Sequence, residues 1–244
     1  MCTRNSLFPD PAEQLKTEAM ALLSIANLTK SYVGPEGASR AILKIDSFLM
    51  DAAQSVALRG ESGSGKTTFL NLIAGILRAD AGDIRIDGEA MTALPESERD
   101  RLRAAKIGYI FQTFNLLQGF TCLENVLLGM KFGPGADRNR AEELLRRVGL
   151  AERFHYYPRQ LSSGQQQRVA VARALANHPK LVLADEPTGN LDRRNSTEAL
   201  RLIQETCREN GAALLLVSHD PDVLGAFANV QDFHALNRAL QTVA

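Results

Sequence analysis

The sequence predicts an α/β fold with a mainly parallel sheet, an antiparallel β region before it, and an inserted α-helical subdomain. Three observations support this. An alternating strand at 55–59 leads through a glycine-rich turn into an apolar helix at 66–77. The fully apolar run 181–184 and the run 213–218, apolar up to its last residue, are typical of strands buried on both faces of a parallel sheet. The intervening stretch 113–158 has a mainly helical pattern, which places a helical insertion inside an α/β core.

The length of 244 residues suits one large domain with an ample core. We expect residues 1–23 to form a loose extension, because they are mostly polar, contain two prolines and lack the apolar stretch of a secretion signal. Residues 24–244 would form the domain, with the helical subdomain at about 113–165. Met20 directly precedes the first strand-like run, so both Met1 and Met20 remain candidate starts.

Composition restricts the partners. The 28 basic residues balance the 28 acidic ones, which argues against a nucleic-acid-binding surface. The cysteines Cys2, Cys122 and Cys207 are far apart, fit neither a disulfide framework nor a metal cluster, and suit a reducing cytosol. No run approaches the roughly 18 apolar residues of a membrane span, so we expect the chain not to cross a bilayer unaided.

The first two strand-like runs, 25–32 and 41–50, flank the loop 33–39, which contains two glycines and a proline. They are therefore predicted to form an antiparallel pair. The later elements follow from period and turn residues. We expect strands at 83–88 and 107–111, and helices at 97–105, at 122–130, at 137–148, from 168 to about 177, and from a capping box of Asn195 and Glu198 to about 209.

The turn after the strand at 55–59 matches the phosphate-binding pattern G-x-x-x-x-G-K-[ST] without a gap. Its glycines let successive backbone N–H groups point at an anion, and the following helix start adds a positive field. Lys66 would reach the β- and γ-phosphates, and the Thr67 hydroxyl would ligate Mg²⁺. The alternative is a glycine-rich turn that only connects strand to helix. The predicted triphosphate-binding residues of this P-loop NTPase core are Gly60, Glu61, Ser62, Gly63, Ser64, Gly65, Lys66, Thr67 and Thr68.

Several polar residues stand where predicted strands end. Asp185 and Glu186 follow the apolar strand at 181–184, an edge where the ligands of parallel sheets bind. Gln112 and His219 end two other strands, although a histidine there is more often structural. Tyr32 ends the first strand and is either an adenine-stacking ring or an ordinary strand tyrosine.

The segment 161–168, LSSGQQQR, precedes a helix. The Ser162 hydroxyl and the exposed N–H groups near Gly164 would form a second anion site at the helix start. The alternative is a serine-capped helix that serves structure alone.

Taken together and in this order, these motifs resemble the ATP-binding subunit of ABC transporters over about residues 25–222. The resemblance implies that Tyr32 stacks on adenine and that Asp185 holds Mg²⁺. It implies that Glu186 orients and deprotonates the attacking water, that Gln112 touches Mg²⁺ and this water, and that His219 bonds the γ-phosphate. Phosphoryl transfer needs charge compensation and an aligned nucleophile, which suits this set.

The resemblance also implies that the helix start after residue 161 faces the phosphate loop of a second copy. Two ATP molecules would lie between two chains, each contacted by Lys66 of one and by the signature residues of the other. The family motif usually reads L-S-G-G-Q, and serine disfavours the positive φ that glycine allows, so the substitution puts the local geometry in doubt. The signature residues are Ser162, Ser163, Gly164 and Gln165.

Residues 111–117 and 184–192 resemble the lipoprotein-releasing and macrolide-exporting (LolD/MacB-like) branch, with the cell-division ATPase as a near relative. This implies an ATPase on the cytoplasmic side of the inner membrane that drives an integral membrane permease. The cargo would be lipoproteins, peptides or hydrophobic compounds. The alternative is an ATP-controlled regulatory or scaffolding module of the division type that transports nothing. A DNA-repair ATPase would need a long coiled coil, and the sequence between Gly65 and Ser162 is too short for one.

Two more expectations concern surfaces. Four apolar residues beyond Gln112 are predicted to form a permease socket, with subdomain core as the alternative. They are Phe114, Leu116, Leu117 and Phe120. The end of the chain, residues 227–244, departs from the family because it lacks a hairpin ending in Asp-Gly-Arg-Ile.

Overall fold

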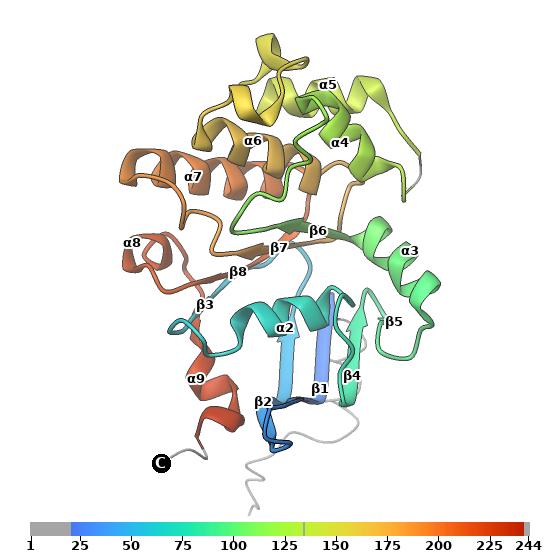
Figure 1. Cartoon of the computed structure of the whole chain (residues 1–244), viewed down its shortest axis with the longest axis vertical. Coiled ribbons are helices and arrows are strands. Elements are labelled where there is room, and N and C mark those ends of the chain that lie inside the picture. The colour runs from blue at the N-terminus through green and yellow to red at the C-terminus, as the bar shows by residue number, and fades with distance from the viewer. Residues whose placement is uncertain (1–20, 134, 242–244) are drawn as a thin grey trace, which may run out of the picture.

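The computed structural model describes residues 21–133 and 135–241 and confirms the α/β class (Figure 1). A helical layer covers one face of a parallel sheet, and an antiparallel sheet lies beyond its other face. The strands are β1 (Leu23–Val33), β2 (Ser39–Met50), β3 (Ser55–Arg59), β4 (Ala81–Ile86), β5 (Glu89–Ala90), β6 (Ile107–Ile110), β7 (Leu181–Asp185), β8 (Ala213–Ser218) and β9 (Val230–Asp232). The helices are α2 (Lys66–Ile73), α3 (Glu96–Lys106), α4 (Cys122–Met130), α5 (Arg138–Arg147), α6 (Ser163–Ala174), α7 (Arg193–Glu209), α8 (Pro221–Leu224) and α9 (Phe233–Leu236), with the 3-10 turns η1 (Ala151–Arg153), η2 (Pro158–Gln160) and η3 (Arg238–Leu240).

The antiparallel strands form a sheet of their own, in the order β2-β1-β4-β5. Strand β1 pairs with β2 along nearly its whole length and with β4 on its other side. Apolar side chains such as Ile25, Leu43 and Ile84 alternate with exposed ones and are buried against α2 and the parallel sheet. The predicted mixed sheet is therefore two sheets that share one core.

The second sheet is fully parallel, in the order β6-β7-β8-β3-β9. Strands β7 and β8 are buried on both faces, as their apolar runs predict. The carboxyl ends of all five strands meet at one edge, where β3 continues into α2. Helix α2 ends at Ile73, earlier than predicted, because the chain turns through Gly75 with a φ of +65°.

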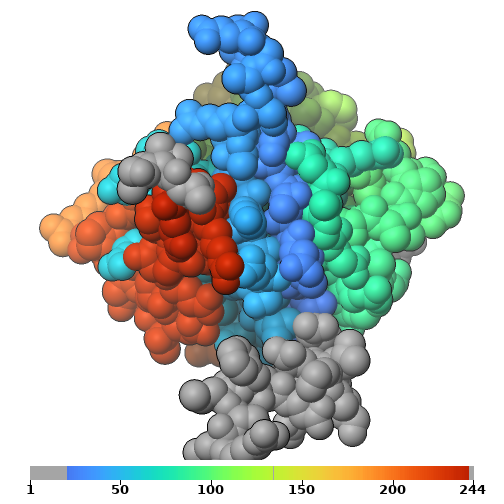
Figure 2. Space-filling view, turned by 90° about the horizontal axis from the view of Figure 1, so that it is seen from below, coloured from blue at the N-terminus to red at the C-terminus, as the bar shows by residue number. Residues whose placement is uncertain are grey.

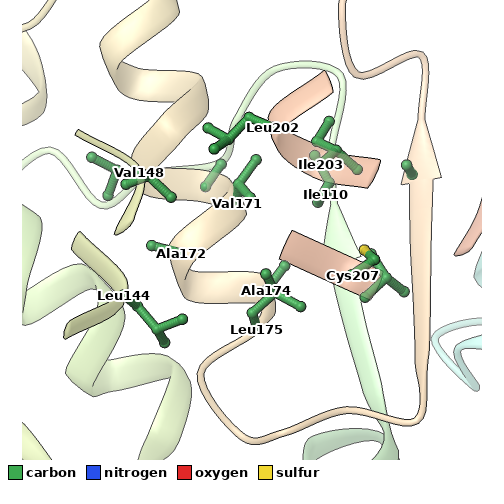
Figure 3. Close-up of a cluster of buried hydrophobic side chains, with 14 of the residues drawn as sticks. Ile110, Leu144, Val148, Val171, Ala172, Ala174, Leu175, Leu202, Ile203 and Cys207 are labelled. Carbon is green, nitrogen blue, oxygen red and sulfur yellow. The ribbon is translucent and has the colours of Figure 1, made fainter. Parts of the chain in front are cut away.

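The helical layer consists of α4, α5, α6 and α7, and α6 packs against the other three. Figure 3 shows their apolar side chains meeting around α6, with Leu144 from α5, Val171 from α6 and Ile203 from α7. The layer thus continues past residue 165, where the helical subdomain was expected to end. None of the helices in the part of the chain described here combines the length and the apolar character that a bilayer crossing demands.

The start of α7 corrects one prediction. Its N-cap is Asp192, whose Oδ1 accepts a hydrogen bond from the Asn195 backbone N–H at 3.0 Å. Glu198 does not complete a capping box, because its carboxylate forms an ion pair with Arg168 at 2.7 Å. The helix therefore begins at Arg193, one turn before the predicted start.

At the first described residues, Ala21, Leu22 and Leu23 are buried and Leu23 opens β1. The fold therefore begins slightly before the boundary expected at residue 24. The rest of the predicted extension, with both candidate starts, lies outside the described residues. Near the other end, α9 and η3 lie beside β2 (Figure 2), where Arg238 forms an ion pair with Asp46.

Candidate functional site

The phosphate loop connects the end of β3 to the start of α2. Gly65 caps α2 with a φ of +97°, and no side chain bonds the first N–H groups of the helix. Those N–H groups therefore remain open to an anion, at the positive end of the helix dipole. Gly63 also has a positive φ, of +79°. At Gly60 the limit is space, since a Cβ there would lie 3.2 Å from Cβ of Phe233.

Lys66 is the first residue of α2, and its side chain is only 6% exposed. Its Nζ donates to the carbonyl oxygens of Gly60 at 2.6 Å and Glu61 at 2.7 Å. The same Nζ lies 3.6 Å from Oε1 of Glu186. The ammonium is thus held by its own loop and by one carboxylate, and a phosphate oxygen that binds it must take the place of a carbonyl.

Glu186 follows β7 and has a φ of +43°, a left-handed conformation that is strained for a residue with a side chain. Its Oε1 lies 2.9 Å from Nδ1 of His219, and its Oε2 accepts a hydrogen bond from Oγ of Ser218 at 3.1 Å. Its backbone N–H donates to the carbonyl of Val217. The carboxylate is therefore fixed between the phosphate-loop lysine and the end of β8. Sequence reasoning did not single out Ser218.

Asp185 lies beside Glu186 as the last, buried residue of β7. Burial raises the pKa of its carboxyl group, and the charge of Glu186 adds to this, while a hydrogen bond from the Thr67 side chain acts in the opposite direction. The structure thus brings together a hydroxyl and a carboxylate, the oxygen donors that Mg²⁺ prefers. Two of the three predicted metal-binding residues, Thr67 and Asp185, therefore fit such an ion.

Gln112 is exposed and lies against the turn at 189–190. Its backbone carbonyl accepts a hydrogen bond from Nδ2 of Asn190 at 2.6 Å, and its Nε2 would lie 3.3 Å from a Cβ at Gly189. The Gly189 N–H in turn donates to the carbonyl of Glu186, which joins Gln112 to the same cluster. The ring of Tyr32 is exposed, and its centroid lies 5.6 Å from Nζ of Lys30.

The predicted second anion site is the start of α6. Ser162 is its N-cap, and its Oγ accepts from the Gln165 N–H at 3.3 Å while Oε1 of Gln165 accepts from the Ser162 N–H at 3.1 Å. Ser163 is the first helical residue and does not have a positive φ, so the doubt about replacing glycine here is removed. Gly164 packs closely, because a Cβ there would lie 3.2 Å from Oδ1 of Asn195.

Within one chain, this helix start and the phosphate loop are not brought together. Helix α6 lies over one face of the parallel sheet and α2 over the other (Figure 1). Ser162 and Ser163 are exposed. The structure therefore assembles Lys66, Thr67, Asp185, Glu186 and His219 into one cluster and leaves the signature residues at a separate surface.

Two residues near the end of the chain support the phosphate loop and were not predicted. Asn237 is fully buried, and its Oδ1 accepts from the Lys44 N–H while its Nδ2 donates to the carbonyl of Ile42 at 2.9 Å and of Ser64 at 3.4 Å. The Phe233 ring packs on the ring of Phe69 in α2. The only local signal was the spacing of Asp232 and Asn237, which cap α9 and η3.

Comparison with known proteins decides the family. The family described as "ABC transporter" matches residues 43–189. A curated relative, the "Lipoprotein-releasing system ATP-binding protein LolD 2" of Rhodospirillum rubrum, is 47% identical over 208 residues, which cover 84% of this chain and 90% of the relative. The chain belongs to the ABC transporter family. It is an ABC-type ATPase, which binds and hydrolyses ATP.

Other relatives agree with this assignment. The "Macrolide export ATP-binding/permease protein MacB" of Syntrophobacter fumaroxidans is 43% identical over 209 residues. The match covers 84% of this chain but only 29% of that relative. Two solved dimeric structures of the ATP-binding cassette MJ0796 are similar. One, a post-hydrolysis state bound to ADP and Pi, has a TM-score of 0.79, 37% identity, and coverage of 89% of this chain and 95% of that one. The other has a TM-score of 0.78, 38% identity, and coverage of 86% and 93%.

Proposed function

We propose that this ATPase works as a pair of identical chains that enclose two ATP molecules and drive a membrane permease from the cytoplasmic side. The permease would export or release lipoproteins, peptides or hydrophobic compounds. The single observation that supports it best is the placement of Glu186, which is fixed between Lys66 and His219 where the strands of the parallel sheet end. The names of the LolD 2 and MacB relatives, which concern lipoprotein release and macrolide export, favour this class of cargo.

In this proposal Glu186 is the general base that orients and deprotonates the attacking water. The hydrogen bond from Oγ of Ser218 holds its carboxylate in place, which reduces the reorganisation that catalysis requires. Lys66 exchanges the carbonyls of its own loop for phosphate oxygens, and this releases its ion pair with Glu186. His219, freed from the carboxylate, bonds the γ-phosphate, and Tyr32 stacks on the adenine.

Thr67 and Asp185 would hold Mg²⁺, with Gln112 completing the site. Bound there, the ion would neutralise charge on the β- and γ-phosphates. The raised pKa of Asp185 means that its ionised form is costly in the folded chain without a cation. The side chain therefore favours cation binding.

The exposed start of α6 supports the pairing of two copies. Ser162 and Ser163 lie at an open helix N-terminus, and no nucleotide bound to the phosphate loop of the same chain can reach it across the sheet. A second copy would supply the missing contact, so that Lys66 of one chain and Ser162 to Gln165 of the other share one ATP. The dimeric state of the two similar cassettes supports this arrangement.

The structure changes where we expect the permease to bind. Phe114 and Leu116 are buried in the core, whereas Leu117 and Phe120 are each 43% exposed. A groove of about 620 Å³ lies between α3, the edge strand β6 and the helical layer. Phe111 and Phe132 both line this groove, and Phe132 is 72% exposed. We propose that a permease helix lies in this groove, next to Gln112.

The catalytic part is tested with Glu186→Gln. The amide cannot accept the proton of water, so ATP hydrolysis falls about 1,000-fold while ATP binding persists. The ATP-bound dimer then becomes stable enough to isolate by size-exclusion chromatography. Glu152→Gln, the same change at an exposed position in η1, leaves both properties unaltered. Hydrolysis at the normal rate by Glu186→Gln would remove the residue from its role.

The transport part is tested by purifying the chain from detergent-solubilised membranes and identifying the membrane polypeptide that accompanies it. A permease that stimulates the ATPase and moves a lipid-modified or hydrophobic cargo in vesicles supports the proposal. A partner that responds to ATP but moves nothing would favour the regulatory, division-type alternative.

A further inference from the structure

A second cavity lies at the end of α2 opposite the phosphate loop. It has a volume of about 640 Å³ and lies between the segment 75–82, which leads from α2 to β4, and the segment 91–95, which leads from β5 to α3. Figure 1 shows these elements side by side at one end of α2. A helix of eight residues separates the cavity from the phosphate loop by about 12 Å. The cavity is therefore distinct from the nucleotide site.

One wall of this cavity contains a buried arginine without a partner. Arg99, in the first turns of α3, is 7% exposed. Its Nε is fully buried and has no hydrogen-bond partner, and no ion pair or hydrogen bond of its guanidinium occurs within residues 21–133 and 135–241. A guanidinium stays charged in proteins, so a buried Nε–H that donates to no acceptor is unfavourable. A group outside this chain that accepts its hydrogen bonds would remove that cost.

The charges around the cavity favour an anion. Arg78 lies on the wall and adds a second positive group. Asp80 is the acidic residue among the lining residues, and it is already paired, with Nζ of Lys30 at 2.8 Å and the Ser31 N–H at 2.6 Å. The pKa of Asp80 is lowered by these contacts, so it stays ionised and committed to Lys30. The two arginines therefore leave the cavity with a net positive charge.

We propose that this cavity binds a small molecule bearing a phosphate or carboxylate group, with Arg99 as the residue that recognises the group. A guanidinium matches the oxygens of either anion through two parallel hydrogen bonds. Leu72 and Met91, both buried, give the cavity an apolar floor against which the rest of the ligand packs. The site is independent of the proposed transport function.

The test uses the full chain saturated with ADP, so that the phosphate loop is occupied. The melting temperature is measured in inorganic phosphate and in acetate, each against sodium chloride at equal ionic strength. At about ten times the dissociation constant, binding raises the melting temperature by about 3 °C. Arg99→Gln abolishes that rise. Arg101→Gln, which removes the same charge from an exposed position on the same helix, retains it.

Ala93→Trp provides a second variant if Arg99→Gln fails to fold, because Ala93 also lines the cavity, a larger side chain there would reduce its volume, and Arg99 stays in place. It should also abolish the rise. A rise in phosphate alone or in acetate alone shows which of the two groups the site binds. A rise in both shows that the site binds either group. The absence of any anion-specific rise, or a rise that Arg99→Gln and Ala93→Trp both preserve, would overturn the proposal.

Discussion

The starts of α2 and α6 are both helix N-termini offered to phosphate, yet they are built differently. At α2 the cap is Gly65 with a positive φ, no side chain occupies the first N–H groups, and Lys66 is buried beside them. At α6 Ser162 caps the helix through a reciprocal pair of bonds with Gln165, and Ser162 and Ser163 are exposed. The first site is complete within one chain. The second has one reciprocal pair of cap bonds, and in the proposed dimer its ligand would be held by the other chain.

The largest effect on this contrast is expected from Lys66→Ala. The buried ammonium is the charged partner of the phosphates, so its loss should weaken ATP binding about 100-fold. Binding is measured by titration calorimetry on the purified chain. Lys44→Ala removes an exposed lysine nearby and should change nothing. Equal affinities in the two variants would mean that the phosphates lie elsewhere.

Ser162→Ala should have an intermediate effect of a different kind. We expect ATP binding to the isolated chain to stay the same, and ATPase activity to fall about 10-fold, because in the proposed dimer the hydroxyl contacts only the ATP held by the other chain. The loss of an N-cap also costs about 1 kcal/mol of stability. Asp137→Ala, which removes the equivalent cap of α5, controls for that cost and should leave the ATPase activity intact.

Mixing the Lys66→Ala and Ser162→Ala chains tests whether the two helix starts contact the same nucleotide. A dimer of one Lys66→Ala chain and one Ser162→Ala chain retains one pocket with both groups intact. The mixture should therefore be more active than either variant alone, measured as phosphate release. If mixing restores nothing, the two helix starts do not share a nucleotide.

Gly65→Ala should have the smallest effect. The new Cβ would lie 3.3 Å from the side chains of Ile42 and Leu43, at a φ of +97°. We expect the free energy of unfolding to fall by about 1–2 kcal/mol in chemical denaturation. Gly63 has a similar φ, but nothing lies within 4 Å of a Cβ placed there. Gly63→Ala therefore measures the effect of backbone strain without a close contact and should lower the free energy of unfolding by less. A larger cost at Gly63 would contradict the close packing inferred at Gly65.

Local signals predicted much of this fold. Helix α4 was predicted with the bounds that the structure has, and the structure shows that Thr121 and Glu124 form a capping box at its start. The strands β7 and β8 followed from short, uninterrupted apolar runs. The start of α7 was misplaced because Asn195 and Glu198 were taken as its capping box, whereas Asp192 is the N-cap.

Contacts between segments far apart in the chain could not be predicted from the sequence. Nothing local to Asn237 shows that it will hydrogen-bond to Ile42 and Ser64, and nothing near Phe114 shows that it packs into the core rather than on the surface. The same holds for the ion pair between Lys66 and Glu186, which follow two different strands of the parallel sheet. The predicted residues of the site were near strand ends, but their mutual distances depend on the topology of the sheet.

The strand order has a consequence for how the protein is made. Strand β3, which leads into the phosphate loop, pairs with β8 through Ser55 and Leu214 and with β9 through Ala57 and Val230. A ribosome synthesises these partners last, so β3 must wait for nearly the entire polypeptide, whereas β1, β2 and β4 can pair soon after they emerge. A nascent chain halted before β9 should therefore carry a folded antiparallel sheet and no competent ATP pocket.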